Sequence, residues 1–254
     1  MDEALRPEVK YFNDKSVEYR KEYDRVTAEG YSFRVRREKV LAMVPPHTKV
    51  VDIASGPGVM IPGLREKHCD ITVTDAAPEM IARTKEEYGE APDVKAVVGD
   101  AYALPFESGV YDVAIAMGLI EYLDDEAKYL NETNRILKPG GMAIITFPNR
   151  PAPFRAIGRL VLAIARALGK KPTPGNVTHR EYTAKGASDL MAQHGFKTEE
   201  VVYYNFKVIP FPLDMWLPRL TVAQSRLFEH LDRGPFKWFG TGFILKATKQ
   251  QKLF

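Results

Sequence analysis

The chain has 254 residues, of which 45% are hydrophobic and 27% charged, which is ordinary for a globular protein and argues against extensive disorder. The net charge is +3, but residues 1–150 sum to −6 (20 basic, 26 acidic) and residues 151–254 to +9 (16 basic, 7 acidic). Cys69 is the single cysteine, and no signal core, bilayer-spanning run or zinc spacing occurs, so we expect a cytoplasmic protein without disulfides or metal.

Helical and strand-like segments alternate through the first 150 residues. A helical stretch over 11–43, with a break near 28–30, comes first. Short β-branched runs then predict strands at 49–53, 71–74, 94–98, 111–117 and 142–147, with helices at 78–88 and 125–137. The breaker Lys138-Pro139-Gly140-Gly141 separates the last helix from the strand at 142. This alternation predicts βαβ units in a doubly wound α/β sheet, whose ligands bind beyond the carboxyl ends of the strands.

The pattern loosens after Pro148. It predicts an amphipathic helix over 154–168, a loop at 172–175, helices at 183–194 and 222–231, and strands at 197–206 and 242–248. Gly195 follows the second of these helices as a typical stop. The length of the chain suits a single domain over 1–254 with a modest insertion.

A turn of small residues follows the first predicted strand, in Val51-Asp52-Ile53-Ala54-Ser55-Gly56-Pro57-Gly58. Nucleotide, flavin and dinucleotide enzymes all use such a turn, because small residues let the backbone approach a ligand. Val59 stands where a dinucleotide fingerprint has its third glycine, which disfavours an NAD-dependent oxidoreductase. Asp52 would repel a pyrophosphate but would attract the ammonium of an amino acid, such as the methionine part of S-adenosylmethionine.

Two further acids close the next strands. Asp75 can accept hydrogen bonds from ribose hydroxyls, which does not separate S-adenosylmethionine from NAD. Asp100, between Gly99 and Ala101, can accept from an adenine amino group while the following N–H meets a ring nitrogen. Each acid alone reads as a helix cap or loop residue. Three acids at successive strand ends, with the small-residue turn, predict a nucleoside-containing cofactor.

Five segments carry a family resemblance. In their order and spacing, VVDIASGPGV, VTDAAPEMI, VVGDAYALPF, YDVAIAMGLIEYL and ILKPGGMAIITF resemble the motifs of class I S-adenosylmethionine-dependent methyltransferases, most closely the small-molecule, quinone-biosynthesis-like branch. The resemblance covers about residues 11–147 and resumes at 182–196 and in the last strand. It implies a Rossmann-like seven-stranded sheet whose last strand is antiparallel. It also implies methylation of O, N or C on a small, apolar or lipid-like acceptor.

The resemblance also implies residue roles. The methionine end would contact Asp52, Ala54, Ser55, Gly56 and Gly58; the ribose Asp75; the adenine Ala76, Met80, Gly99, Asp100 and Ala101; and the methyl group Met117 and Gly118. Ala54 departs from the glycine usual in the family, and Tyr122 stands where many members have histidine, so acceptor chemistry based on that histidine does not transfer. The implied organisation is lid helices at 11–44, a cofactor core at 45–150, a helical insertion at 151–181 and a sheet-completing cap at 182–254.

The sequence says less about the residues that bind the methyl acceptor. Tyr11, Tyr19 and Tyr23 share one helical face, which fits either a lid over the cofactor or a core-facing stripe. His179 fits either a general base or a loop and capping residue. The candidate residues of the acceptor pocket are Tyr122, Phe154, Tyr204 and Phe206.

The helix at 154–168 carries its arginines opposite its aliphatic residues. It fits a substrate cap, plain packing, or an interfacial helix that touches an anionic membrane surface. The basic C-terminal part leaves a nucleic-acid methyltransferase as an alternative, but no Asn/Asp-Pro-Pro-Tyr/Phe motif follows the fourth strand. A binding module that has kept the fold and lost transfer is a further alternative. The oligomeric state is not predicted.

Overall fold

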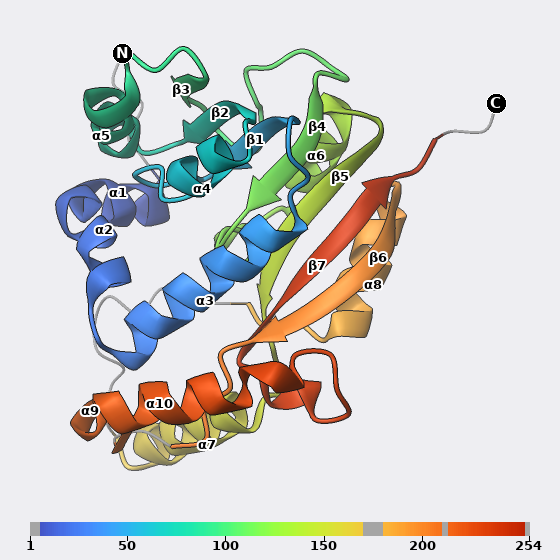
Figure 1. The fold of residues 1–254 in the computed structure, drawn as a ribbon. Coiled ribbons are helices and arrows are strands. Elements are labelled where there is room, and N and C mark those ends of the chain that lie inside the picture. The colour runs from blue at the N-terminus through green and yellow to red at the C-terminus, as the bar shows by residue number, and fades with distance from the viewer. Residues whose placement is uncertain (1–5, 170–179, 210–212, 252–254) are drawn as a thin grey trace.

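The computed structural model describes residues 6–169, 180–209 and 213–251 and contains a seven-stranded sheet between two layers of helices (Figure 1). The strands are β1 (Lys49–Ile53), β2 (Asp70–Asp75), β3 (Val94–Val98), β4 (Tyr111–Ala116), β5 (Leu137–Pro148), β6 (Phe196–Tyr204) and β7 (Gly242–Lys249). Their order is β3-β2-β1-β4-β5-β7-β6, and β7 runs antiparallel to both of its neighbours. The predicted fold class, with its antiparallel last strand, is confirmed.

The chain order reverses at β1, which pairs in parallel with β2 on one side and with β4 on the other. Ile53, at the carboxyl end of β1, lies beside Thr74 of β2 and Ala116 of β4. The loops after β2 and β4 therefore diverge on either side of the turn after β1. This is the crevice in which doubly wound sheets bind their ligands.

Helices cover both faces of the sheet. They are α1 (Pro7–Asp14), α2 (Ser16–Asp24), α3 (Ala28–Met43), α4 (Ile61–Glu66), α5 (Pro78–Tyr88), α6 (Glu126–Ile136), α7 (Pro153–Ala167), α8 (Ala184–Gln193), α9 (Leu213–Trp216) and α10 (Pro218–Phe228), with short 3₁₀ turns η1 (Ile120–Tyr122), η2 (Glu229–Leu231) and η3 (Lys237–Phe239). Apolar residues of α3, α4 and α5 pack on one face, and those of α6 and α8 pack on the other. Val113 and Ile115 of β4 join one cluster, and Ala114 and Ala116 join the other, as the two-residue period of a strand requires.

Predicted boundaries near the N-terminus and at β5 were wrong. The N-terminal helix begins at Pro7 and is interrupted twice, at Lys15 and before Thr27, whose hydroxyl caps α3 by accepting from the Gly30 N–H at 3.0 Å. β5 begins at Leu137 and includes the expected breaker. The register with β4 shifts between Tyr111 and Val113, so the extra residues form an irregularity in the strand rather than a loop.

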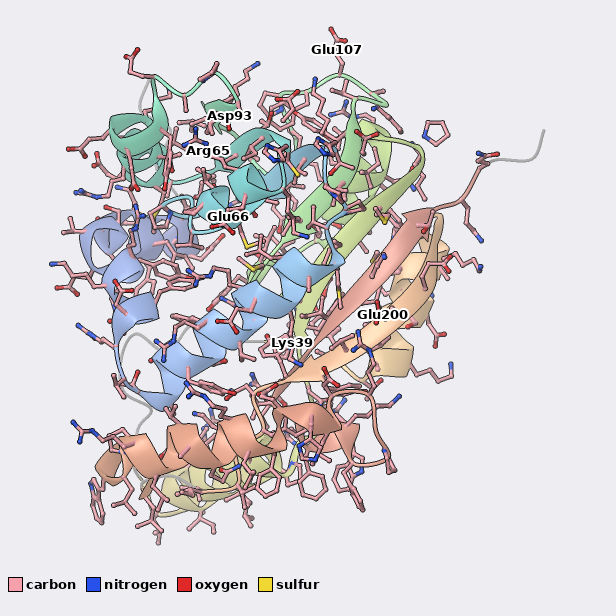
Figure 2. The ribbon with its side chains drawn as sticks, viewed as in Figure 1. Lys39, Arg65, Glu66, Asp93, Glu107 and Glu200 are labelled. Atoms are coloured by element: carbon pink, nitrogen blue, oxygen red, sulfur yellow. The ribbon has the colours of Figure 1, made fainter. Side chains whose placement is uncertain are left out.

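One end of the molecule is built from α7, α9 and α10, at the bottom of the view in Figure 1. Lys39 of α3, labelled in Figure 2, ties the layer above to η2, because its ammonium lies 2.5 Å from Asp232 and 3.5 Å from Glu229. The strand predicted at 197–206 begins one residue earlier, at Phe196, and ends two residues earlier, at Tyr204. The helix predicted at 222–231 begins at Pro218. In the described part of the chain, no helix has the length and apolar character needed to span a bilayer.

Candidate functional site

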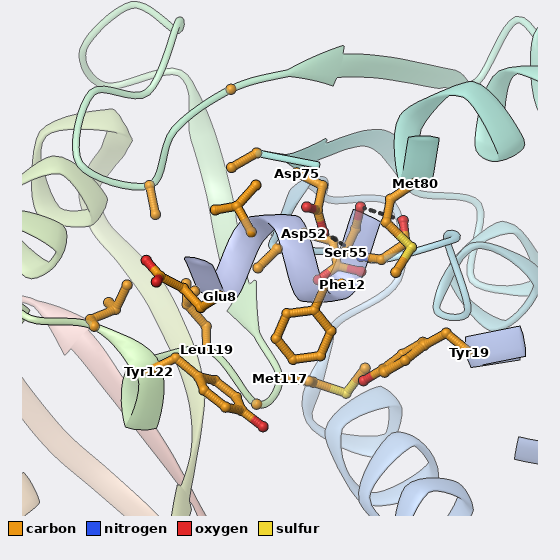
Figure 3. Close-up of a pocket in the computed structure, with 18 of the residues that line it drawn as sticks. Glu8, Phe12, Tyr19, Asp52, Ser55, Asp75, Met80, Met117, Leu119 and Tyr122 are labelled. Atoms are coloured by element: carbon orange, nitrogen blue, oxygen red, sulfur yellow. Dashed lines mark hydrogen bonds between the residues drawn. The ribbon is translucent and has the colours of Figure 1, made fainter. Parts of the chain in front are cut away.

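A cavity opens at the carboxyl ends of β1, β2 and β4, with α1 and α2 on its outer side (Figure 3). Of the predicted cofactor residues, it is lined by Asp52, Ala54, Ser55, Gly56, Asp75, Ala76, Met80, Gly99, Ala101, Met117, Gly118 and Tyr19. Gly58, Asp100 and Tyr11 do not line it. The sheet therefore brings together the strand-end residues that the motifs predicted to bind the cofactor, although these residues are far apart in the sequence.

Asp52 has an unusual environment for a carboxylate. Its side chain is 1% exposed, and both carboxylate oxygens lack a hydrogen-bond partner among the described residues. Burial, reinforced by the neighbouring charge of Asp75, raises the pKa of Asp52 to about 8. Burying a carboxylate that accepts no hydrogen bond destabilises the folded protein. A cationic ligand group in the cavity would remove that destabilisation.

The turn after β1 is held by backbone geometry. Ala54, Gly56 and Gly58 all have positive φ values, of 56°, 54° and 72°. A β-carbon at Gly58 would lie 2.6 Å from Ile61 Cδ1, so this position needs glycine for both conformation and space. Ala54 tolerates the left-handed region at a cost, which explains why glycine is the usual residue of the family there.

Asp75 is tied to the same turn. Its carboxylate accepts hydrogen bonds from the Gly56 N–H and the Ala77 N–H, both at 2.8 Å. Burial raises the pKa of Asp75, while these backbone donors oppose the rise. Each carboxylate oxygen has a second lone pair, so Asp75 could still accept from a ligand in the cavity.

Asp100 has its own protein partners. Its carboxylate accepts from the Tyr102 N–H at 2.9 Å and pairs with Arg6 at 3.1 Å. The neighbours Gly99 and Ala101 line the cavity, whereas the Asp100 side chain does not. The structure thus gives Asp100 the bonds of a turn-stabilising residue, and its predicted contact with adenine stays a prediction.

Aromatic residues of α1 and α2 form the outer wall. The ring centroid of Phe12 lies 6.0 Å from that of Tyr19 and 5.3 Å from that of Tyr122, both edge to face, and Figure 3 shows Phe12 between these two tyrosines. Tyr11, at 36% exposed, turns away from this cavity and lines a second one. The predicted lid face is therefore divided, with Tyr19 and Tyr23 over the first cavity and Tyr11 beside the second.

The second cavity, of about 730 Å³, adjoins the first. Phe12, Tyr19, Gly118 and Tyr122 line both, so these residues form the boundary between them. The predicted acceptor residues Tyr122, Phe154 and Tyr204 are among its lining.

Phe206 was placed wrongly. It is 1% exposed and packs in the core cluster under α6 and α8, because Asn205, at φ 59°, turns the chain after β6. His179 lies outside the described residues.

Several lining residues escaped the sequence analysis. Arg36 is 7% exposed on α3 and, with Glu121, lines the second cavity. Arg36 stands in a basic run that reads as a solvated helix face, so a single sequence offers no signal for its burial. Among the described residues, no group of acidic, histidine or cysteine side chains is arranged to hold a metal ion.

Comparison with known proteins supports the motif assignment. Residues 51–145 match a family model described as a methyltransferase domain. Demethylmenaquinone methyltransferase of Thermus thermophilus is 37% identical over 142 residues, covering 53% of this chain and 63% of that protein. The chloroplastic 2-methyl-6-phytyl-1,4-hydroquinone methyltransferase of Arabidopsis thaliana is 31% identical over 134 residues, covering 51% and 39%. The chain thus spans less than two thirds of the length of either relative.

The fold likeness extends over nearly the whole chain. A S-adenosylmethionine-dependent methyltransferase structure from Thermotoga maritima aligns with a TM-score of 0.66 at 21% identity, covering 94% of this chain and 98% of that one. The methyltransferase motifs are therefore confirmed over residues 51–145, and the rest of the chain shares the fold of that structure. The family model covers residues 51–145 only, so the second cavity, which is lined mostly by residues before 51 and after 145, lies mostly outside it.

Proposed function

We propose that this chain is an enzyme that binds S-adenosylmethionine and transfers its methyl group to a small, quinone-like apolar molecule. The observation that carries the cofactor assignment is Asp52, a buried carboxylate without a partner that faces the first cavity. The sulfonium cofactor supplies an electrophilic methyl group. An amino acid ammonium on Asp52 would complete the bonding of this carboxylate, whereas a pyrophosphate would be repelled.

The assignment of the other residues follows from their places along the cavity. Asp75 would accept from the ribose, Ala76 and Met80 would border the adenine, and Met117 and Gly118 would lie beside the methyl group. Phe12 and Tyr19 would exclude water above it, which favours transfer because the two reactants must be held in line in a dry site. We assign all 254 residues to a single methyltransferase domain.

Calorimetric titration tests the cofactor. S-adenosylhomocysteine should bind the wild-type protein, NADH should not, and Asp52→Asn should weaken binding by about 30-fold or more, since a charged hydrogen bond is lost. Asp70→Asn is the matched control, because Asp70 lies at the opposite end of β2 and is exposed. Binding of NADH instead, or equal affinity in wild type and Asp52→Asn, would refute the assignment.

The acceptor assignment rests on the relatives and on the second cavity. Both relatives are named for quinone-type substrates, and the cavity beside Gly118 combines aromatic and aliphatic walls with a few polar groups. Methyl transfer to reduced 1,4-naphthoquinones of increasing chain length would test this class. If the protein binds S-adenosylhomocysteine but methylates none of these naphthoquinols, the quinone-type acceptor is refuted.

Contact with an anionic lipid surface would fit such an acceptor. Large apolar side chains are exposed along α7 and α10, including Leu160, Ile164 and Leu220, and Trp216 of α9 is 72% exposed. Together α7 and α10 carry five arginines and no acidic residue. Apolar residues flanked by arginines are typical of helices that lie in a lipid interface.

We also infer a cytoplasmic location, which the free thiol of Cys69 supports.

Vesicle co-sedimentation tests this contact. Wild-type protein should pellet with phosphatidylglycerol vesicles at low salt and less with phosphatidylcholine vesicles. Leu160→Glu should reduce pelleting. Val26→Glu is the control, because Val26 precedes α3, far from α7 in the chain, and both side chains are 61% exposed. If the two variants pellet equally, the proposed contact of α7 with the lipid surface is refuted.

A further inference from the structure

Two buried groups of opposite charge face the second cavity. Arg36 is 7% and Glu121 is 9% exposed, and both line the cavity. Arg36 Nε and Glu121 Oε2 have no hydrogen-bond partner among the described residues, and no ion pair within 4.0 Å joins the two side chains. Buried charges are normally paired and fully hydrogen-bonded. Arg36 also hydrogen-bonds to Tyr204, but Arg36 Nε and Glu121 Oε2 are each left without a partner, which points to a ligand in this cavity that bonds to both.

Arg36 lies at the boundary between the two cavities. A β-carbon added to Gly118 would lie 2.9 Å from Arg36 Nη1, so the guanidinium rests against a residue that lines both cavities. The guanidinium also stacks over the Phe33 ring, 5.2 Å from its centroid. These contacts fix the cation close to the position proposed for the methyl group.

Glu121 is placed to exchange a proton. Burial raises its pKa, and the charges of Arg36 and Arg155 oppose the rise. A carboxylate with a raised pKa is a stronger base than an exposed one, which suits it to accept a proton from a hydroxyl group.

We propose that Arg36 and Glu121 form the subsite for an ionisable hydroxyl of the acceptor, with Arg36 binding the oxygen and Glu121 receiving its proton. The inference rests on the proposed methyltransferase function and names the reacting group of its substrate. The acceptor class is a phenol or hydroquinone with an apolar remainder. That remainder would lie toward α7, where Phe154, Gly158 and Leu162 line the same cavity.

The proton and electron balance is simple. The acceptor O–H bond breaks and its proton passes to the Glu121 carboxylate. The electron pair of the oxygen forms the bond to the methyl carbon, while the pair of the broken carbon–sulfur bond stays on sulfur. When a ring carbon conjugated with the oxygen attacks instead, that carbon afterwards loses its own proton to solvent, which restores the aromatic ring, and the oxygen regains the proton held by Glu121. Arg36 stabilises the oxyanion without reorganisation, because its guanidinium is already held against Gly118 and the Phe33 ring.

A pair of probes tests the oxyanion site without requiring turnover. We would titrate 2-hydroxy-1,4-naphthoquinone, an anion at neutral pH, and its neutral ether 2-methoxy-1,4-naphthoquinone into protein saturated with S-adenosylhomocysteine. The wild-type protein should bind the anion about tenfold or more tightly than the ether, as expected for a buried charge-assisted hydrogen bond. Arg36→Gln should abolish this preference. Equal affinities in the wild type, no binding of either probe, or a preference kept in Arg36→Gln would overturn the proposal.

Two variants complete the design. Arg65→Gln removes an arginine whose surface pair with Asp93, at 2.8 Å, lies away from both cavities (Figure 2), and it should keep the preference. Glu121→Gln should bind the anion at least as tightly as wild type, because a like charge is gone. The same variant should slow methylation of 1,4-dihydroxynaphthalene and flatten the rise of its rate with pH. Unchanged turnover and an unchanged pH profile in Glu121→Gln would overturn the role of Glu121, and this test holds even if Arg36→Gln does not fold.

The binding of S-adenosylhomocysteine separates the two levels of inference. If it binds and the naphthoquinone preference does not depend on Arg36, the oxyanion site fails and the methyltransferase stands. If it does not bind, the proposed function itself fails.

Discussion

The two cavities are assembled in different ways. The first takes Asp52, Gly56 and Asp75 from the ends of two paired strands, within 24 consecutive residues. The second takes Arg36 from α3, Glu121 from η1 and Tyr204 from the end of β6. A site built on adjacent strand ends inherits its geometry from local turn chemistry, whereas a site built from distant elements depends on how the whole chain packs.

The difference also concerns charge. In the first cavity the carboxylate of Asp52 is buried without a hydrogen-bond partner, and in the second Arg36 and Glu121 are buried without forming an ion pair with each other. Both arrangements sacrifice stability in the ligand-free protein. Measurements that separate stability from binding should therefore reveal which cavity each residue serves.

The largest effect should come from the ionisation of Asp52. Its pKa rises from 3.8 to about 8 on folding, so the native state binds the extra proton and stability is lost as pH rises from about 4 to about 8. At pH 8 the loss is on the order of 5 kcal/mol, from about 1.4 kcal/mol per pKa unit. Asp52→Asn should remove this pH dependence and raise the free energy of unfolding above that of the wild type at pH 8.

Urea unfolding at pH 5 and pH 8 would measure it. Asp70→Asn should keep the wild-type slope with pH, because the Asp70 side chain is exposed at the other end of β2. If the free energy of unfolding changes with pH in the same way in wild type and Asp52→Asn, Asp52 already has a partner in solution. The first cavity would then hold no unpaired acid.

The next largest effect is expected for Phe206, whose substitution distinguishes a role in the core from a role in the acceptor pocket. Phe206→Ala should lower the free energy of unfolding by about 4 kcal/mol, because it empties a fully buried site in the core. Binding of S-adenosylhomocysteine and of the hydroxynaphthoquinone should stay within about twofold of wild type under native conditions. A variant of normal stability with weakened naphthoquinone binding would return Phe206 to the acceptor pocket, where the sequence analysis had placed it.

The misplacement of Phe206 shows where sequence reasoning ends. The positive φ at Asn205 turns the chain at the end of β6, and nothing in the residue types around Tyr204 and Phe206 indicates which of the two aromatic rings also reaches the second cavity. Strand ends near Asp52 and Asp75 were predictable, because each follows a β-branched run and precedes a turn or a proline-started helix. The core of the sheet could be predicted for the same reason.

Arg36 could not be predicted, and neither could the boundaries of β5. The burial of Arg36 depends on α2 and β6 closing around α3, which are tertiary contacts between distant segments. The run Lys138-Pro139-Gly140-Gly141 has the composition of a turn, but the pairing with β4 absorbs it as an irregularity. In both cases long-range packing overrides the local preference of the sequence.

Gly118 tests whether the two cavities are independent, because it belongs to both. Gly118→Ala places a methyl group 2.9 Å from Arg36 Nη1 at a φ of 71°, which costs about 1–2 kcal/mol of backbone strain and displaces the guanidinium. We expect affinity for 2-hydroxy-1,4-naphthoquinone to fall about tenfold, and affinity for S-adenosylhomocysteine to fall less. Calorimetry of both ligands provides the measurement, and an equal loss of both affinities would mean that the two cavities are coupled through Gly118 rather than independent.

The smallest effect concerns Ala54, the departure from the family pattern inside the more predictable cavity. Its φ of 56° costs an alanine about 1–2 kcal/mol, and glycine would remove that cost while adding about 0.5–1 kcal/mol of unfolded-chain entropy. Ala54→Gly should therefore stabilise the protein by about 0.5–1 kcal/mol in urea unfolding. Ala103→Gly is the control. Ala103 is exposed and has no positive φ, so the same change there should destabilise.

The sign of the Ala54→Gly result decides what the alanine does. Stabilisation with unchanged affinity for S-adenosylhomocysteine would mean that the turn tolerates alanine and that its shape is set by the bonds of Asp75 to Gly56 and Ala77. Stabilisation with weaker affinity would mean that the strained alanine holds the turn ready for the ligand, since rigidity lost in the free protein must be recovered on binding. Destabilisation would show that the neighbouring β1 and β2 ends absorb the strain, and local turn chemistry would then be a weaker guide to this cavity than the sequence suggests.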